Sequence, residues 1–252
     1  MPENDRRPPP QAAEEPGESP AAPGHRSNLR KCFEEIRELI VHGRLSPGSR
    51  IMEGDLASRL GVSRTPVRSA LHMLHKEGYI IASSESTRKV RLTVAPLTKE
   101  DANELYPIVG RLEGLAARST AALDPAARAG VAQKLKRIND DLRGLAEAGR
   151  SDPNAIFELD MNFHQTIVDA GAGSRLRALH SGIKPQTERY WRLYASSILD
   201  QLGTSVAEHL AIVGAIEHGD PEAAERAVQL NWENGAERLS RVIERHGERG
   251  SW

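Results

Sequence analysis

The stretch RIMEGDLASRLGVSRTPVRSALHMLHKEG, residues 50–78, decides the fold of the first part of the chain. Residues 53–60 place apolar side chains at helical spacing, and Gly61 stands where a helix C-cap is expected. A second helix is predicted to start after Ser63, because serine caps helix N-termini and Pro66 is tolerated in a first turn. Its buried stripe would consist of Val67, Ala70, Leu71 and Leu74. Two short helices joined by a tight turn indicate a helix-turn-helix.

The segments on either side complete a small domain. Residues 28–41 repeat apolar side chains at steps of three and four, which predicts an amphipathic helix. Residues 79–82 are mostly apolar and residues 90–94 alternate, as strands do, with the polar turn-forming stretch 83–89 between them. A hairpin with a basic tip that follows a helix-turn-helix predicts a wing. We therefore expect a winged helix-turn-helix domain over residues 27–96.

One face of the helix after Ser63 is suited to DNA. Opposite its apolar stripe it carries Arg64, Thr65, Arg68, Ser69 and His72. Arginine can bond two guanine acceptors at once in the major groove, so Arg64 and Arg68 are predicted to read bases. Phosphate or minor-groove contacts are predicted for the other basic residues of the domain, which are Arg50, Arg88, Lys89 and Arg91. For the charges alone, the alternative is an ordinary solvated helix face and hairpin.

The net charge of −1 hides a segregation of charge along the chain. Residues 27–97 carry 12 basic and 7 acidic side chains, a net charge of +5. Residues 1–26 have a net charge of −2 and residues 98–252 a net charge of −4. A basic unit joined to an acidic one favours a polyanionic partner for the first unit only.

The rest of the chain reads as a tail and a helical bundle. Residues 1–26 hold 7 of the 15 prolines and no apolar periodicity, which predicts a disordered tail. Residues 97–248 show helical periodicity only, with a proline at or near several helix starts. The predicted fold class is mainly α, with an all-α bundle of six to seven helices after the winged domain. Its predicted helices span 98–122, 125–148, 153–170, 174–182, 186–200, 204–217 and 221–246.

The helix-turn-helix resembles that of the GntR family of bacterial transcription regulators. The family string G-V-S-R-T-P-V-R is intact over residues 61–68, and an I-x-x-G-x-L-x-P-G type of run precedes it. The resemblance covers about 65 residues. It implies a winged helix-turn-helix that binds double-stranded DNA.

Polar residues in the bundle suggest a metal site. Asp160 and His164 are four residues apart and share a helix face, while His209 lies within an apolar series and is expected to point inward. Asn231 is a further polar residue near the apolar positions of the last helix. A carboxylate and imidazoles can hold a divalent ion. The alternative is a hydrogen-bonded Asp–His pair and a core histidine.

The same segments resemble the effector-binding FadR C-terminal domain of this family. The pattern D-x-x-x-H followed by E-H-x-x-I matches the family at Asp160, His164 and His209. The resemblance implies a divalent ion, of the zinc, nickel or manganese class, that helps to hold a carboxylate. Asn231 stands where the family has its last histidine, and it is a weaker ligand.

Two further segments could serve this effector site. Arg111 matches a recurrent family arginine and could bind the effector carboxylate, with a salt bridge to Glu113 or a neighbour as the alternative. Residues 188–194 are rich in aromatic side chains and could line a pocket, although such a cluster is more often part of a core.

Together these features predict a ligand-responsive transcription regulator. We expect a homodimer that binds a pseudo-palindromic operator, because one recognition helix reads too few bases. The family resemblance implies a repressor that a small carboxylate metabolite releases. An architectural DNA-binding protein whose bundle only dimerises is the first alternative. The second is a metal-dependent enzyme, although no activated nucleophile accompanies the candidate ligands.

The composition also bears on the compartment. Cys32 is the only cysteine, so an internal disulfide is excluded. No apolar stretch approaches the roughly 18 residues of a membrane helix, and the first residues are polar. We expect no membrane partner and a cytoplasmic protein that is associated with the nucleoid when it is bound to DNA.

Overall fold

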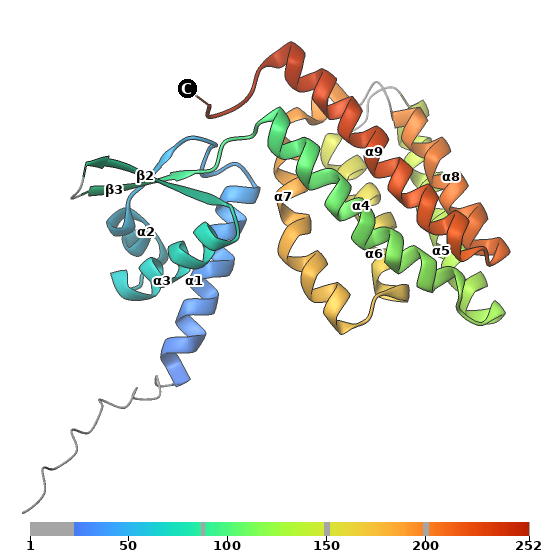
Figure 1. The fold of residues 1–252 in the computed structure, drawn as a ribbon, viewed down its shortest axis with the longest axis horizontal. Coiled ribbons are helices and arrows are strands. Elements are labelled where there is room, and N and C mark those ends of the chain that lie inside the picture. The colour runs from blue at the N-terminus through green and yellow to red at the C-terminus, as the bar shows by residue number, and fades with distance from the viewer. Residues whose placement is uncertain (1–22, 87–88, 149–151, 199–201, 252) are drawn as a thin grey trace, which may run out of the picture.

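The computed structural model describes residues 23–86, 89–148, 152–198 and 202–251. These residues form a small N-terminal domain and a larger all-helical domain (Figure 1). The fold class expected from the sequence, a winged helix-turn-helix followed by a helical bundle, is therefore confirmed. The N-terminal domain consists of α1 (Pro23–Val41), β1 (Arg50–Ile51), α2 (Glu53–Leu60), α3 (Arg64–Lys76), β2 (Ile80–Ser86) and β3 (Lys89–Val94).

The turn between α2 and α3 depends on the backbone conformation of Gly61, and Pro66 follows in the first turn of α3. Gly61 adopts the left-handed conformation, φ 65°, and caps α2 as expected. Ser63 occupies the N-cap position of α3, but its side chain makes no capping hydrogen bond, so that part of the prediction is wrong. Pro66 stands at the third helical position and has no N–H to donate, so only the N–H of Thr65 is left as a capping donor. The predicted stripe is buried: Val67, Ala70, Leu71 and Leu74.

The sheet is larger than the sequence indicates. Its strand order is β1-β3-β2, all antiparallel, with Arg50 opposite Thr93 and Ile80 opposite Val94. The two-residue strand β1 was not predicted. The hairpin strands reach Ser86 and Lys89, so the predicted turn over 83–89 is too long. Serine-rich wing strands lack apolar alternation, which is why the pattern does not reveal them.

The first helix also starts earlier than predicted. α1 begins at Pro23, inside the stretch 1–26 that the sequence predicts to be a tail. Residues 1–22 lie outside the described residues.

The helical domain contains α4 (Lys99–Ala121), α5 (Pro125–Glu147), α6 (Pro153–Gly171), α7 (Ser174–Ile198), α8 (Leu202–His218) and α9 (Pro221–His246). Three of these helices start at an Asp-Pro pair, in which the aspartate accepts hydrogen bonds from the first free N–H groups. The capping aspartates are Asp124, Asp152 and Asp220. Within the described ranges, no helix is long and apolar enough to cross a bilayer.

The sequence predicts two helices where α7 is one. Pro185 was expected to start a helix, but it lies inside α7. Side chains on both sides of the proline belong to the domain core, with Tyr190 fully buried and Ile183 packed against the same cluster. This packing offsets the hydrogen bond that an internal proline removes.

α4 and α9 lie side by side through the middle of the domain (Figure 1). Gly110 of α4 permits this close approach, because a Cβ atom there would clash with the side chain of Trp232 on α9. The contact places the Trp232 indole beside the interior of the bundle.

α7 also forms the junction between the two domains. The Gln186 side-chain amide donates to the carbonyl oxygen of Glu77 at 2.7 Å, directly after α3. The buried Arg189 guanidinium donates to the carbonyl oxygen of Ala95 at 2.5 Å, at the end of the wing. One helix of the bundle therefore binds the N-terminal domain through two side-chain hydrogen bonds.

The segment after α9 returns to the same junction (Figure 1). Leu97 and Arg249 form an antiparallel bridge with N···O distances of 2.8 and 3.1 Å. Next to it, Gly48 and Gly250 approach so closely that a side chain on either would meet the other backbone. The link between the domains is thus paired with a second segment.

Candidate functional site

The structure places the predicted recognition residues on one side of α3. Arg64, Thr65, Arg68 and His72 are exposed, and Ser69 is half-buried. They lie opposite the buried stripe, as the helical spacing requires. This face is available to a nucleic acid.

Arg68 has a partner in the DNA-free protein. Its Nε lies 3.1 Å from both carboxylate oxygens of Glu53, and its Nη2 donates to Oε2 at 2.9 Å. These hydrogen bonds raise the pKa of Arg68. Ion pairs between exposed side chains are weak, so guanine acceptors can displace Glu53. Glu53 thus holds the guanidinium extended at the start of α2.

The structure describes only some of the other residues that the sequence predicts to contact DNA. Arg50 is exposed on β1, and Arg91 is half-buried on β3. Lys89 begins β3, but its side chain lies outside the described residues, as does the whole of Arg88.

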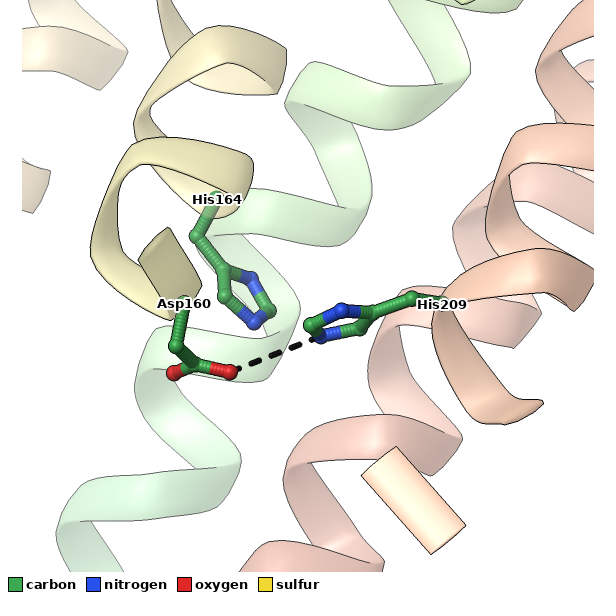
Figure 2. Close-up of side chains that lie close together, drawn as sticks. All are labelled: Asp160, His164 and His209. Carbon is green, nitrogen blue, oxygen red and sulfur yellow. Dashed lines mark ion pairs between the residues drawn. The ribbon is translucent and has the colours of Figure 1, made fainter. Parts of the chain in front are cut away.

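The predicted metal ligands come together inside the bundle. Asp160 and His164 project from α6 and His209 from α8, toward one another (Figure 2). One potential ligand atom from each residue lies within 4.8 Å of the others. His209 Nε2 is 3.6 Å from Asp160 Oδ1, too far for a hydrogen bond. Two imidazole nitrogens and a carboxylate oxygen suit zinc and similar divalent ions.

The protonation of His209 follows from its neighbour Asn139. The Asn139 side-chain amide donates to the carbonyl oxygen of Val206 at 3.1 Å, which turns its oxygen toward the imidazole. His209 Nδ1 then donates to that oxygen at 3.2 Å, and Nε2 carries the lone pair. Nε2 is buried and has no hydrogen-bond partner. A lone pair that faces a carboxylate is the arrangement a cation would satisfy.

His209 remains neutral in this environment. Burial lowers its pKa to about 4, although the charge of Asp160 opposes the shift. The ring also stacks on Phe163, with centroids 3.9 Å apart. A neutral imidazole is the form that binds metal ions.

His164 is oriented by a buried carboxylate that the sequence did not single out for this role. His164 Nδ1 donates to Glu113 Oε2 at 2.6 Å, which leaves its other nitrogen for a metal. Glu113 is fully buried and also accepts from His180 Nε2 and Trp232 Nε1, each at 2.8 Å. Burial alone would raise the pKa of Glu113, but His164 and His180 outweigh it and hold that pKa far below its usual range.

Asn231 lies near the candidate metal ligands, but its side chain is hydrogen-bonded to Glu208 and not to any of them. It is buried, and its amide nitrogen donates to Glu208 Oε2 at 2.8 Å. Glu208 also binds Arg238 with contacts of 2.8 and 3.0 Å. The Asn231 side-chain oxygen is therefore the atom that could face a cation.

Arg111 is not brought to this site. It is exposed on α4 and binds Gln229 and Glu233 of α9. Glu113, two residues along, points into the core instead, because residues at that spacing do not share a helix face. The surface salt bridge considered from the sequence therefore forms, with Glu233 as the partner, and the effector role of Arg111 gains no support.

A cavity of about 80 Å³ lies beside the candidate metal ligands. Asp160, His164 and Asn231 contribute to its wall, together with Glu188 and Trp191 from the aromatic-rich segment 188–194. The tyrosines of that segment, Tyr190 and Tyr194, belong to the core. Sequence reasoning missed other wall residues, which include Tyr106, Lys184 and Trp232. They come from three different helices, and no short motif connects them.

Comparison with known proteins agrees with both parts of this architecture. Residues 30–90 match the model of the bacterial regulatory proteins of the gntR family, and residues 104–234 match the FCD domain model. The first match covers the helix-turn-helix and much of the wing. The second covers the helices that supply the candidate metal ligands.

Individual relatives point the same way. The chain is 26% identical over 217 residues to the HTH-type transcriptional regulator YdhC of Bacillus subtilis, which covers 84% of this chain and 91% of the relative. It is 30% identical over 203 residues to a Paenarthrobacter nicotinovorans protein named "Probable D-xylose utilization operon transcriptional repressor", covering 77% and 82%. The solved structure of E. coli McbR/YncC shares the fold, with a TM-score of 0.64, 18% identity, and coverage of 87% and 99%. The chain belongs to the GntR family of bacterial regulatory proteins, carries an FCD domain behind its DNA-binding domain, and has transcriptional regulators rather than enzymes as its relatives.

Proposed function

We propose that this protein is a ligand-responsive repressor of the FadR subfamily. A homodimer would bind a pseudo-palindromic operator and leave it when a small carboxylate binds beside a divalent metal ion. The observation that carries the effector site is the buried, unpartnered Nε2 of His209, which faces Asp160 next to a cavity. The DNA part rests on the exposed face of α3 in a GntR-type domain.

Asp160, His164 and His209 would hold the metal ion. The hydrogen bonds that His209 donates to Asn139 and His164 donates to Glu113 support this, because each fixes a ring so that its lone pair is directed to the site. The bound ion would supply a Lewis-acid centre that attracts a carboxylate oxygen. Asn231, in the place of a histidine, offers a neutral oxygen and weakens the site for zinc or nickel relative to manganese.

The operator would be read by two copies of α3, one from each subunit. Arg64 and Arg68 are proposed to contact bases, with Thr65, Ser69 and His72 beside them on the same face. Arg50, Arg88, Lys89 and Arg91 are proposed to contact phosphates or the minor groove. A dimer is proposed because a single helix gives too little specificity for a regulator.

α7 is proposed to couple the effector site to DNA. Thr187, Glu188 and Trp191 of α7 line the cavity. On the same helix, Gln186 and Arg189 bind backbone carbonyls of the DNA-binding domain. A ligand that shifts α7 must therefore shift one domain against the other, which changes operator affinity by the coupling free energy. Repression as the sense of control is supported by the name of the Paenarthrobacter relative.

Metal content tests the proposed ligands. Purified wild-type protein, analysed by inductively coupled plasma mass spectrometry after dialysis, should contain about one divalent ion per chain. His209→Ala should lose this ion, whereas His180→Ala should keep it, because His180 binds Glu113 and lies outside the ligand set. A metal-loaded His209→Ala variant, or a wild type with no affinity for added zinc, nickel or manganese, would contradict the site.

Operator binding tests the regulatory part. An operator selected in vitro should be bound by a dimer, as measured by fluorescence anisotropy and light scattering. Acetate, benzoate or succinate should weaken that binding, and a chelator should remove the response. If DNA affinity stays constant in every carboxylate, the architectural alternative is favoured.

A further inference from the structure

Lys184 of α7 is a buried cation whose contacts are weak. The residue is only 5% exposed, and its Nζ lies 3.0 Å from Met161 Sδ and 4.8 Å from the centre of the Trp232 ring. A thioether is a poor acceptor, and an aromatic face attracts a cation less than a carboxylate does. Across the described part of the chain, no carboxylate oxygen comes within ion-pair distance of this ammonium group.

Two carboxylates, Glu113 and Glu188, interact with the charge of Lys184 without forming an ion pair with it. Glu113 is occupied by His164, His180 and Trp232. Glu188 stands one turn further along α7 and feels the charge of Lys184, but no ion pair joins the two. Taking a cation out of water without a paired anion is costly. The charge of Lys184 therefore acts on Glu113 and Glu188 from a distance, and neither carboxylate forms an ion pair with it.

Lys184 lies in the wall of the effector cavity and also borders a more open groove beside α1. Lys184 is part of the same wall as Asp160 and His164. The Trp232 ring lies next to both His164 and Lys184. Its centroid is 5.3 Å from that of the His164 ring and 4.8 Å from Lys184 Nζ. Arg238 is another cation of the wall, but Glu208 neutralises it through two short contacts.

We propose that Lys184 binds the negative charge of the effector and makes the cavity selective for small organic acids over neutral molecules. This inference deepens the proposed effector site and rests on it. It moves the recognition of the carboxylate from Arg111, which is on the surface, to a buried lysine beside the metal ligands. Aromatic walls from Tyr106, Phe157 and Trp191 would contact the apolar part of the acid.

Matched acids and amides test the selectivity. Titration calorimetry would compare acetate, benzoate and succinate with acetamide, benzamide and succinamide, using the full-length metal-loaded protein. At least one acid should bind, about tenfold or more tightly than its amide, because a charge-assisted hydrogen bond is lost with the charge. Equal affinity for each acid and its amide would overturn the proposal.

The Lys184→Met variant tests the residue itself. Methionine keeps the apolar stem against Trp232 but removes the charge, so affinity for the acid should fall about tenfold or more, while metal content stays unchanged. Lys184→Arg should retain most of the affinity. The melting temperature of the ligand-free Lys184→Met protein should stay level or rise, because a buried unpaired cation is removed. Lys134→Met, the same substitution at an exposed position of α5, should change none of these quantities.

The outcomes separate this inference from the proposed function. Unchanged acid affinity in Lys184→Met would overturn the role of Lys184 and leave the effector site standing. Loss of metal or a lower melting temperature in Lys184→Met would also overturn it, by making the residue structural. If wild-type protein binds none of the three acids, both the inference and the carboxylate part of the proposed function fail.

Discussion

The face of α3 that we propose to bind DNA and the cavity that we propose to bind an effector are built in opposite ways. The face on α3 consists of neighbouring residues of one helix, and most of its side chains are exposed. The cavity and its supporting groups draw on six helices, and the groups that orient the ligands, such as Glu113 and Asn139, are fully buried. Replacing an exposed side chain changes binding and leaves folding intact. Replacing a buried one in the cavity changes both, because its partners lose their hydrogen bonds.

This contrast predicts its largest effect at Glu113, where a small effect would contradict it. Glu113→Ala leaves three buried donors without their acceptor, on His164, His180 and Trp232. The free energy of unfolding should fall by about 3–5 kcal/mol, as measured by urea denaturation followed by circular dichroism. Glu104→Ala, at an exposed position of the same helix, should fall within about 0.5 kcal/mol of wild type. Similar stability of the two variants would mean that the cavity does not share its groups with the core.

A pH dependence should come from His209. Its pKa is about 4 in the folded protein, against an ordinary value of 6.5. Between these values the unfolded chain takes up a proton that the folded chain does not. The free energy of unfolding of chelator-treated protein should therefore decrease as pH falls from 6.5 to 4, by on the order of 3 kcal/mol. Above pH 6.5, His209 is neutral in both the folded and the unfolded chain, so its contribution to the free energy of unfolding no longer changes with pH.

Two glutamine variants isolate that dependence. His209→Gln cannot take up the proton, so its stability curve should be flatter than the wild-type curve over this range. His72→Gln, at an exposed position of α3, should follow the wild type. Parallel curves for His209→Gln and wild type would mean that another group is responsible.

On the DNA-binding face, Arg68→Ala should act on binding alone. Loss of a bidentate base contact should weaken operator binding by about 1–3 kcal/mol, with a much smaller change on random DNA. Stability should be nearly unchanged, since the pair with Glu53 is on the surface. Lys76→Ala, in the last turn of the same helix, serves as the control. An equal loss on both DNAs would assign Arg68 to phosphate contact.

The smallest effect is expected at Arg111. Arg111→Ala removes exposed contacts with Gln229 and Glu233, so stability should change by about 0.5 kcal/mol or less. Benzoate affinity, measured by calorimetry, should equal that of wild type. A tenfold loss would return Arg111 to the effector site and weaken the division between surface and cavity.

The same division explains what the sequence predicts well. Gly61, Pro66 and the apolar stripe of α3 act through neighbouring residues, so the helix-turn-helix can be read from a short string. Asp160 and His164 can be paired because one helical turn separates them. Pro185 misleads because core packing outweighs the missing backbone hydrogen bond.

The missed residues depend on contacts between distant segments. Glu113 looks like a surface partner of Arg111 until the packing of α4 turns it toward His164 and His180. Asn139 is one polar residue among many in α5, and only its place beside His209 gives it a role. Lys184 reads as an ordinary helical lysine. These roles require the three-dimensional arrangement, because no local periodicity encodes them.

The bridge between Leu97 and Arg249 has a mechanical consequence for signalling. A single extended linker would let the DNA-binding domain swing freely. Here a second backbone segment is fastened to it by two hydrogen bonds, close to the contact between Gly48 and Gly250. Together with the contacts of Gln186 and Arg189, this pairing ties the two domains to each other at several places. A movement of α7 would therefore be passed to the N-terminal domain as a movement of a body held at several points, and not through a single extended linker.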